Sequence, residues 1–566
     1  MNKSITGIIY KKEYKVKPVS HLKYSFSPSS EIHAKSSVII DNRPWCSGDL
    51  SDKTILKIVE NCNDNQSFIQ NGAWSIVHFL NNKESLVLIR DIVGIHPLYY
   101  SQSSNCFAFS DSLHMLVQLL DSPLKLESQS LAEMLFFNKM DRSEKTLIQG
   151  VREVKQSQSV SFNWRDWKLE SNTYLDTEAN LPHLSYSDLV IKNRTQIQRF
   201  IEDDIVNYSS QSNAAFLSGG IDSSCLVQIL APKLTSKKLS FYTMTFEDAS
   251  IDESKYAKII SQQFPSNDWI QLTVNSEEYK IDIENLHRVI EWPTLSSGTY
   301  NQYKLIQRCK EDGQKVIWDG LGADAIYGGH DYYRHELAAH YFKNLKIRAL
   351  QELLGWKQSS KNEILNASKT LLKQSSWTSK WIFKLYMIYI NELKLYNRDF
   401  LDRSLNVLEY GSKKPLKDQM RDDFFNGGIR HLSRFTNRIS KDFDIKMKYP
   451  FAENVKWANH ILESPYEYRF HKGASKAILR DSFKNELPKK ILKRRDKKGL
   501  LSPNNQWIEE QKEHWIEYFG DHMSDVYDLQ YLKDNYKVMW TISNKPENYR
   551  QFKHISFAIW RKVMKI

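Results

Sequence analysis

The chain has 566 residues, of which 41% are hydrophobic and 26% charged, and its formal net charge is +12. This length predicts two or more domains, and the composition excludes a disordered or fibrous chain. The positive charge favours anionic partners such as nucleotides or nucleic acid. The cysteines have no zinc-ligand or disulfide spacing, which favours a reducing cytoplasmic location; they are Cys46, Cys62, Cys106, Cys225 and Cys309.

Neither a signal peptide nor a membrane span is expected. The N-terminal sequence MNKSITGIIYKKEYKV has no long apolar stretch. The most lipid-like segment, WIFKLYMIYI at 381–390, is shorter than the roughly 20 residues that cross a bilayer, so it predicts a buried helix. We expect a protein without a membrane partner.

Short apolar runs separated by Gly, Asn, Ser and Asp characterise the first 180 residues. They are typical of β-strands in an antiparallel, layered domain, and examples are SVIID (37–41), WSIVHFL (74–80), SLVLIRD (85–91) and PLYY (97–100). A polar stretch at 175–190 ends this region, and a serine-capped helix is predicted directly after it. The sequence therefore predicts domains at 1–180 and 186–566.

From residue 214 the pattern changes to alternating strands and helices. The segments AAFLS, SFYTMTF, WIQLTV and KVIWDG have the composition of strands, with helical segments between them. This alternation predicts a parallel sheet flanked by helices, an α/β fold after an α+β N-terminal domain. From about 330 onward the chain is predicted to be mostly helical.

The stretch FLSGGIDSS at 216–224 follows the first predicted parallel strand. Gly219 and Gly220 allow close approach of the backbone to an anion, and the helix that follows adds partial positive charge. Ser218 and Ser223 supply hydroxyl donors. Asp222 would repel a phosphate unless a cation lies between them, so it points to Mg²⁺. The alternative is an ordinary strand-to-helix turn, but the full S-G-G-x-D-S pattern resembles the pyrophosphate loop of the ATP pyrophosphatase superfamily (adenine nucleotide alpha hydrolase-like).

Three further motifs resemble those of asparagine synthetases, in the same order along the chain. DGLGADAIYGG at 319–329 resembles (S/D)GxGxDExxxGG, and NRISKDFDIKMKYPFAE resembles NRxSMxxxIExRxPFLD. KAILRDSFKNELPKKILKRRDKKGLLSP at 476–503 resembles K-x-x-L-R…LP-x-x-I-x-x-R-x-K-x-G-F-x-x-P. The resemblance covers about 350 residues and implies an AMP-forming, ATP-dependent C–N ligase.

The first 180 residues resemble the glutaminase domain of the same family, an Ntn-hydrolase-like sandwich. RDIVGIHPLYY matches RDxxGxxPLYY, and FAFSDS matches FASD. The family's nucleophile is a cysteine directly after the initiator Met, where this sequence has Asn2, and the NGEIYN segment is missing. Because an amide cannot form the thioester, we expect an inactive glutaminase kept for packing.

The resemblance implies that a substrate carboxylate attacks the ATP α-phosphate, and that an amine then displaces AMP from the acyl-adenylate. Asp222 and Asp324 would hold Mg²⁺, and Lys497 would be the catalytic lysine. The alternative for Lys497 is a solvated charge run, since Arg495, Lys493 and Lys498 are its basic neighbours. The other residues implied to bind ATP are Leu217, Ser218, Gly219, Gly220, Ser223, Met244, Asp319 and Gly320.

Several departures from the family pattern bear on the substrate. Leu321 replaces a Glu or Tyr, Ala325 replaces the second acid of GxDE, and Lys446 and Lys448 replace the Glu and Arg of IExR. They count against aspartate and favour an amine that the substrate itself carries, as in β-lactam synthetases and lasso-peptide cyclases. The aromatic-rich region 334–435 would then enclose a larger substrate, such as a precursor peptide; simple helical packing is its alternative.

The sequence thus predicts a ligase that forms a lactam or macrolactam from a small-molecule or peptide carboxylate. Ammonia-dependent asparagine synthesis and sugar-acid amidation are alternatives, as is a catalytically dead scaffold. A tRNA-modifying enzyme would lack the synthetase-like N-terminal domain, so nucleic acid is not an expected partner. The oligomeric state is left open.

Overall fold

The computed structural model describes most of the chain, with several gaps. The described residues are 5–10, 45–48, 50–64, 66–80, 83–121, 123–175, 184–234, 239–356, 392–407, 416–425, 429–495, 502–540 and 549–566. Several features named above lie outside these ranges: Asn2, the strand at 37–41, the helix at 381–390 with other parts of the region 334–435, Lys497 and Lys498.

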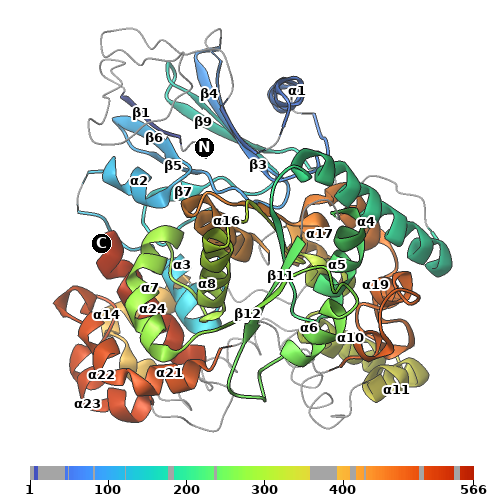
Figure 1. Cartoon of the computed structure of the whole chain (residues 1–566). Helices are drawn as coiled ribbons and strands as arrows, with labels where there is room; N and C mark the ends of the chain where they lie inside the picture. Colours follow the sequence, from blue (N-terminus) through green and yellow to red (C-terminus); the bar gives the residue numbers. More distant parts are fainter. Residues whose placement is uncertain are drawn as a thin grey trace.

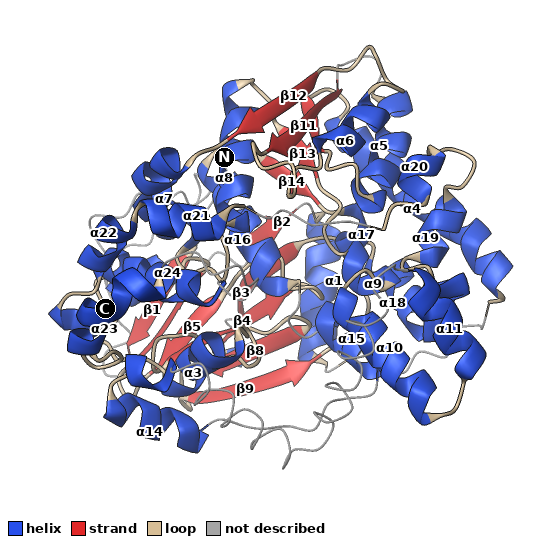
Figure 2. Ribbon diagram, turned by 90° about the horizontal axis from the view of Figure 1, so that it is seen from below, coloured by secondary structure: helices blue, strands red, loops and turns tan. Residues whose placement is uncertain are grey.

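Two antiparallel sheets form the N-terminal domain (Figures 1 and 2). The first has the order β1-β6-β5-β7, with bounds Thr6–Tyr10, Cys106–Ser110, Tyr99–Gln102 and Val151–Glu153. The second has the order β2-β3-β4-β8-β9, with bounds Trp45–Gly48, Trp74–Leu80, Ser85–Arg90, Gln158–Asn163 and Lys168–Thr173.

The predicted layered domain is confirmed by the way these sheets pack. Leu86 and Leu88 of β4 share one apolar core with Phe107 and Phe109 of β6. Phe107 stacks on Phe162 of β8 with ring centroids 4.0 Å apart. Each sheet therefore buries one face against the other, as a sandwich requires. The domain's helices are α1 (Asp52–Asn63), α2 (Leu113–Gln118) and α3 (Ser128–Phe137).

A five-stranded parallel sheet organises the ligase domain and confirms the predicted α/β class. Its order is β12-β11-β10-β13-β14, with bounds Trp269–Thr273, Leu239–Thr245, Asn213–Phe216, Val316–Trp318 and Lys446–Lys448. Helix α4 (Tyr186–Tyr208) precedes β10, and the helices between β10 and β13 are α5 (Ile221–Lys233), α6 (Ser254–Ser261), α7 (Ser276–Ile290) and α8 (Gly298–Glu311). Ser185 caps α4 as predicted.

The described part of the region after 330 is mostly helical, as predicted, and strand β14 is an exception within it. Its three residues, Lys-Met-Lys, carry no apolar alternation that would mark a strand. It forms because it pairs in parallel with β13, with Val316 opposite Lys446 and Trp318 opposite Lys448. Tertiary pairing thus decides its conformation.

The rest of the described chain is helical. The α-helices are α9 (Ala323–Tyr327), α10 (Asp331–Lys343), α11 (Ile347–Trp356), α14 (Arg398–Val407), α15 (Leu416–Phe425), α16 (Arg430–Asp442), α17 (Pro450–Glu453), α18 (Val455–Glu463), α19 (Ala477–Ser482), α20 (Lys489–Leu492), α21 (Asn504–Glu510), α22 (Lys512–Trp515), α23 (Leu529–Met539) and α24 (Tyr549–Met564). The 3-10 helices are Glu392–Leu395, Tyr466–Gly473, Ile516–Tyr518 and Asp521–Met523. In the described ranges, no helix has the length and apolarity to cross a membrane.

Candidate active site

The loop after β10 is held in shape by its own hydroxyl groups. Ser223 Oγ accepts a hydrogen bond from the Ser218 backbone N–H at 3.3 Å, and the Gly220 N–H donates to Ser218 Oγ at 3.3 Å. Gly220 is the N-cap of α5, so Asp222 and Ser223 lie in the first turn of that helix. The loop therefore combines hydroxyl groups with the positive end of a helix, which is suited to binding an anion.

Gly219 and Arg494 fix the loop against α6. Gly219 has φ +65°, and a Cβ there would overlap the backbone of Tyr256. Arg494 Nη1 donates to the Gly219 carbonyl at 3.1 Å, and its other Nη contacts Glu253. The guanidinium also lies 3.9 Å from the centre of the Tyr256 ring. A single buried arginine thus joins the loop, α6 and the segment that leads to Lys497.

The second motif packs directly on the first. Strands β10 and β13 are hydrogen-bonded neighbours, so the loops after Phe216 and Trp318 meet at one edge of the sheet. A Cβ on Gly320 would lie 3.1 Å from Asp222 Cβ and 3.3 Å from Ser223 N. Only a glycine allows this approach without displacing α5. Asp319 lies one residue earlier, and its backbone N–H donates to the Lys448 carbonyl at 2.9 Å.

Asp222 and Asp324 converge on one cation, the ammonium group of Lys476. Lys476 Nζ lies 2.5 Å from Asp222 Oδ2 and 2.6 Å from Asp324 Oδ1. The Lys476 and Asp222 side chains are 3% and 8% exposed, whereas Asp324 is 31% exposed. Lys476 adopts a left-handed conformation (φ +57°), and Gly329 leaves the space for it, since a Cβ at Gly329 would overlap Lys476 and Asp324. Lys476 heads the K-A-I-L-R motif, the only signal in the sequence that could have singled it out.

The residues present fit a magnesium ion shared with a phosphate group. In the described part of the chain, no cluster of three or more His, Cys, Asp and Glu side chains forms a metal site by itself. Two carboxylates already directed at one cation match the chemistry of Mg²⁺, which commonly uses one or two carboxylates together with substrate phosphates. Asp222 and Asp324 would hold the ion, whose charge would stabilise the departing pyrophosphate.

Two further residues implied to bind ATP, Leu217 and Met244, are buried where the parallel strands end. Leu217 is 1% exposed, its N–H donates to the Tyr242 carbonyl at 2.9 Å, and its carbonyl accepts from Thr243 Oγ1 at 2.6 Å. Met244 is 5% exposed, one residue before the end of β11. Both therefore lie at the carboxyl edge of the sheet, where ligands of parallel sheets bind.

The basic run before Lys497 separates into exposed and buried residues. Lys493 and Arg495 are exposed, as expected of a solvated charge run. Arg494 is 6% exposed and contacts the loop after β10. The sequence prediction named the neighbours of Arg494 and missed Arg494 itself, because exposure cannot be inferred inside a run of like charges.

The substituted positions of the family pattern are mostly structural. Ala325 is 1% exposed. Lys448 is buried and pairs with Glu453 at 2.6 Å and Asp204 at 2.9 Å. Burial alone would lower the pKa of Lys448, but these two carboxylates raise it above its ordinary value. Lys448 is therefore charged and fully engaged in holding β14, whereas Leu321 is only partly buried.

The described cysteines carry no sign of activation. All five are free thiols, and Cys62, Cys225 and Cys309 are buried. Burial raises the pKa of Cys62 to about 12, although a hydrogen bond with Ser159 acts in the opposite direction. A thiol in such surroundings stays protonated and is a poor nucleophile.

A glycine-containing loop and two carboxylates lie at adjacent tips of a parallel sheet, in a two-domain protein with an antiparallel sandwich. Residues 207–552 match the family described as Asparagine synthase, and residues 46–175 match the Glutamine amidotransferase domain. The first match covers more than half of the chain, so the protein belongs to the asparagine synthase family, whose members are ATP-dependent C–N ligases.

Similar proteins are distant in sequence. "Asparagine synthetase [glutamine-hydrolyzing] 3" of Bacillus subtilis (strain 168) is 22% identical over 454 residues, which is 75% of this chain and 66% of the relative. "Asparagine synthetase [glutamine-hydrolyzing] 1" of the same strain is 22% identical over 514 residues, 87% of this chain and 77% of the relative. A solved structure described as "the allosteric regulatory enzyme of purine biosynthesis" matches 40% of this chain and 51% of its own at 8% identity; its TM-score of 0.14 is too low to inform the fold.

Proposed function

We propose that the protein activates a carboxylate with ATP, releasing pyrophosphate, and forms an amide bond between the acyl-adenylate and an amine that the substrate itself carries. The observation that supports this proposal is the convergence of Asp222 and Asp324 on one cation beside the loop at 218–220. In this reaction the carboxylate oxygen bonds to the α-phosphorus and the α–β phosphoanhydride breaks. The amine nitrogen then bonds to the acyl carbon, AMP leaves, and the amine gives up a proton.

The candidate site residues would each have a defined part in the first step, the attack of the carboxylate on the α-phosphate of ATP. Ser218, Gly219, Gly220 and Ser223 would hold the pyrophosphate that leaves, and Asp222 and Asp324 would hold the magnesium ion bound to it. Asp319, Gly320, Leu217 and Met244 would border the adenosine. Lys497 would stabilise charge on the α-phosphate, in the role that the family motif gives it.

The amine would come from the substrate itself. Leu321 offers no proton-transfer group, and Lys448 is engaged with Glu453 and Asp204, so neither is arranged to bind aspartate. In the N-terminal domain, burial raises the pKa of the Cys62 thiol, so this residue gives no support for glutamine hydrolysis. An amine on the substrate itself reacts at high effective concentration and needs no ammonia supply. The product would be a lactam or macrolactam.

Ammonia-dependent or glutamine-dependent asparagine synthesis is the second candidate, and the names of the two Bacillus subtilis relatives favour it. Both candidates use the same nucleotide site, so they differ in substrate alone.

The experiment measures AMP and pyrophosphate formed from Mg²⁺ and ATP under three conditions. The first contains aspartate with ammonium chloride, the second aspartate with glutamine, and the third peptides that carry a free amine and an Asp or Glu side chain. We expect AMP and a product 18 Da lighter than the substrate only with peptides, since one water is lost on closing a lactam (about 18 Da by atomic mass). AMP with aspartate would favour the second candidate, and a lack of binding of any adenine nucleotide would overturn both.

A further inference from the structure

Helix α16 presents one basic face to the N-terminal domain. Its residues Arg430, Arg434, Arg438 and Lys441 follow one another at intervals of four, four and three, which places them on the same side of the helix. Lys441 Nζ lies 2.5 Å from Asp111 Oδ2 in the N-terminal domain. Arg438 contacts Glu291 at the end of α7.

Glu291 in turn joins the two domains. It accepts hydrogen bonds from Ser112 Oγ at 2.5 Å and from the Leu113 N–H at 2.7 Å, both at the start of α2. The contacts of Arg438 and Lys441 thus reach the same corner of the N-terminal domain. This half of the α16 face is anchored through two carboxylates.

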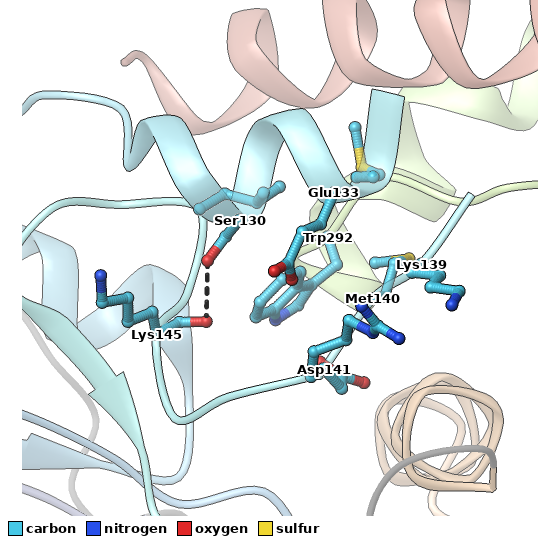
Figure 3. A pocket seen from close by; sticks show the side chains of 10 residues that line it. Ser130, Glu133, Lys139, Met140, Asp141, Lys145 and Trp292 are labelled. Carbon is cyan, nitrogen blue, oxygen red and sulfur yellow. Dashed lines mark hydrogen bonds between the residues drawn. The ribbon is translucent and has the colours of Figure 1, made fainter. Parts of the chain in front are cut away.

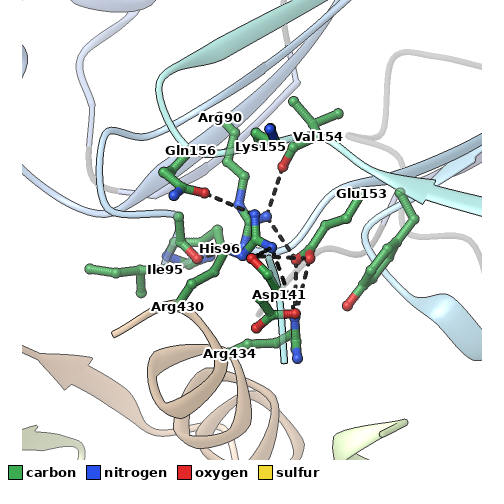
Figure 4. A network of polar contacts seen from close by, with 12 residues as sticks. Arg90, Ile95, His96, Asp141, Glu153, Val154, Lys155, Gln156, Arg430 and Arg434 are labelled. Atoms are coloured by element: carbon green, nitrogen blue, oxygen red, sulfur yellow. Dashed lines mark hydrogen bonds and ion pairs between the residues drawn. The ribbon is translucent and has the colours of Figure 1, made fainter. Parts of the chain in front are cut away.

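The other half of this face enters a buried ionic network (Figure 4). Arg434 Nη1 lies 2.9 Å from Asp141 Oδ1 and 3.2 Å from Glu153 Oε2. Arg90 Nη1 pairs with Glu153 at 2.7 Å, and Arg430 Nη1 donates to Gln156 Oε1 at 2.9 Å. None of the five charged side chains is more than 2% exposed. The network is closed to solvent and binds α16 to the N-terminal domain.

Beside this network lies a cavity of about 10 Å³, lined by Asp141 and Trp292 among others (Figure 3). Such a volume holds about one water molecule. Arg434 covers the Trp292 ring with its guanidinium 4.1 Å from the ring centre. The interface therefore has no space for a substrate at this point, and its arginines are committed to holding the domains together.

Helix α16 also leads directly into the nucleotide site. Three residues separate its end from β14, and the Ile445 N–H donates to the Ser440 carbonyl at 2.8 Å. Tyr449 Oη lies 2.5 Å from Thr436 Oγ1, which ties the end of β14 back to the helix. The Lys448 carbonyl of β14 accepts the backbone N–H of Asp319. A displacement of α16 would therefore displace Asp319.

We propose that the N-terminal domain is a positioning component of the nucleotide site: through the basic face of α16 it sets the position of β14 and hence of Asp319. Arg434 is the central positioning residue. The inference rests on the proposed function, because Asp319 matters only if a nucleotide binds there. It gives the glutaminase-like domain a role in the ligase reaction that requires no hydrolysis of glutamine.

The test compares two arginine variants of the full chain that differ in what the arginine joins. Arg434→Met removes the interdomain contact. Arg561→Met removes a two-point ion pair with Asp525 inside the ligase domain and serves as the control. The probe is Mg²⁺ with an ATP analogue that has a methylene bridge between the α and β phosphates. Its Kd is measured by calorimetry, and the melting temperature of each variant is recorded alongside.

We expect Arg434→Met to raise the Kd roughly fivefold, in the range of couplings measured between distant sites, while Arg561→Met changes it less than about twofold. Arg434→Lys should restore part of the affinity. If Arg434→Met fails to fold, Lys441→Gln breaks the more exposed end of the same face and should shift the Kd in the same direction. An unchanged Kd in the folded variant, or equal changes in Arg434→Met and Arg561→Met, would overturn the inference.

A double-mutant cycle tests whether the effect of Arg434 reaches the nucleotide site through α16 and β14. Tyr449→Phe breaks the tie between α16 and β14, so adding it to Arg434→Met should raise the Kd by less than the product of the two single effects. Independent, multiplicative effects would refute transmission through α16. If the wild-type protein does not bind the analogue, the proposed function itself fails, and that result precedes any variant.

Discussion

Two groups of ion pairs in this protein both combine carboxylates with basic side chains, yet they differ in their exposure to solvent. Asp222, Asp324 and Lys476 contain one more carboxylate than ammonium, and Asp324 is 31% exposed. The interdomain network contains three arginines and two carboxylates, and none of these side chains is more than 2% exposed. The first group is open to solvent at Asp324, whereas the second is sealed.

The difference shows which buried ion pairs indicate a site. A carboxylate at an open edge can reach a cation from solution, so the first group suits a ligand. A closed network gains nothing from a ligand, and breaking it leaves uncompensated charges inside the protein. Exposure therefore separates a candidate active site from a domain interface, since both groups are built from ion pairs.

The largest expected effect comes from removing a carboxylate of the open group. Asp222→Asn keeps the size of the side chain and removes the charge that would hold Mg²⁺. We expect the Kd of the methylene-bridged ATP analogue to rise roughly 100-fold, the upper end of what loss of a metal's supporting group costs. Calorimetry with Mg²⁺ measures this.

The matched control is Asp312→Asn, which removes the charge of a partly exposed pair with Arg308 at the end of α8 and keeps an oxygen that can accept the hydrogen bond from Tyr242. It should leave the Kd within about twofold, as expected of a surface pair. Equal binding by Asp222→Asn and the wild-type protein would remove Asp222 from the site.

Lys476 allows a second test of the open group. Lys476→Gly suits the left-handed backbone and removes the ammonium, so the two carboxylates lose their shared partner. The affinity for the analogue should fall roughly 30-fold, in the middle of the range for a hydrogen bond to a charged group. Mg²⁺ alone should raise the melting temperature of this variant more than that of the wild-type protein, because the ion replaces the missing charge.

Differential scanning calorimetry with and without Mg²⁺ gives this second readout independently of activity. Lys476→Met separates backbone strain from charge, since it keeps most of the side chain. If Mg²⁺ stabilises all three proteins equally, Asp222 and Asp324 do not form a shared cation site.

Much of the open group could be predicted from the sequence, and the closed network could not. Asp222 and Asp324 each follow a recognisable strand, and parallel strands bring their carboxyl ends to one edge. Lys476 lies more than 150 residues further along the chain from Asp324, and only the fold places it between the two carboxylates. The motif that contains Lys476 does not reveal, from the sequence alone, how close this lysine lies to Asp222 and Asp324.

The closed network has few local signals: Arg90 begins the RDIVGIHPLYY motif, but nothing in the sequence points to its partners. Arg90, Asp141, Glu153 and Arg434 come from four separate segments, and charged residues are normally expected at the surface. The same limit applies to β14, whose Lys-Met-Lys sequence is polar. Contacts between distant segments decide both features, and a periodic pattern cannot encode them.

Asp141 provides a pH test of the closed network. Burial alone would raise its pKa, but Arg434 and Arg430 lower it to about 2, against an ordinary value of 3.8. The folded state therefore favours the carboxylate, so this stabilisation is present above about pH 4 and is lost as the pH falls toward 2. Asp141→Asn should reduce the free energy of unfolding by about 2 kcal/mol at pH 7, and this difference should narrow below pH 4.

Urea unfolding of both proteins at several pH values measures the difference. Asp282→Asn, at a partly exposed pair with Lys304, is the control and should cost less than about 1 kcal/mol. A difference between wild type and Asp141→Asn that does not change with pH would show that the Asp141 carboxylate does not contribute through its charge.

The smallest effect is expected at Arg494, which joins a buried ion pair to the anion-binding loop. Arg494→Lys keeps the charge, but a lysine cannot bond Gly219 and Glu253 together while lying flat on Tyr256. We expect the Kd of the analogue to rise roughly five- to tenfold, equivalent to the loss of about one hydrogen bond at 1 to 1.4 kcal/mol. Arg495→Lys, at the exposed neighbouring position, should have no effect. Because both variants make the same chemical change one residue apart, equal Kd values would show that buried contact with the loop does not position it, and that the basic run acts only through its overall charge.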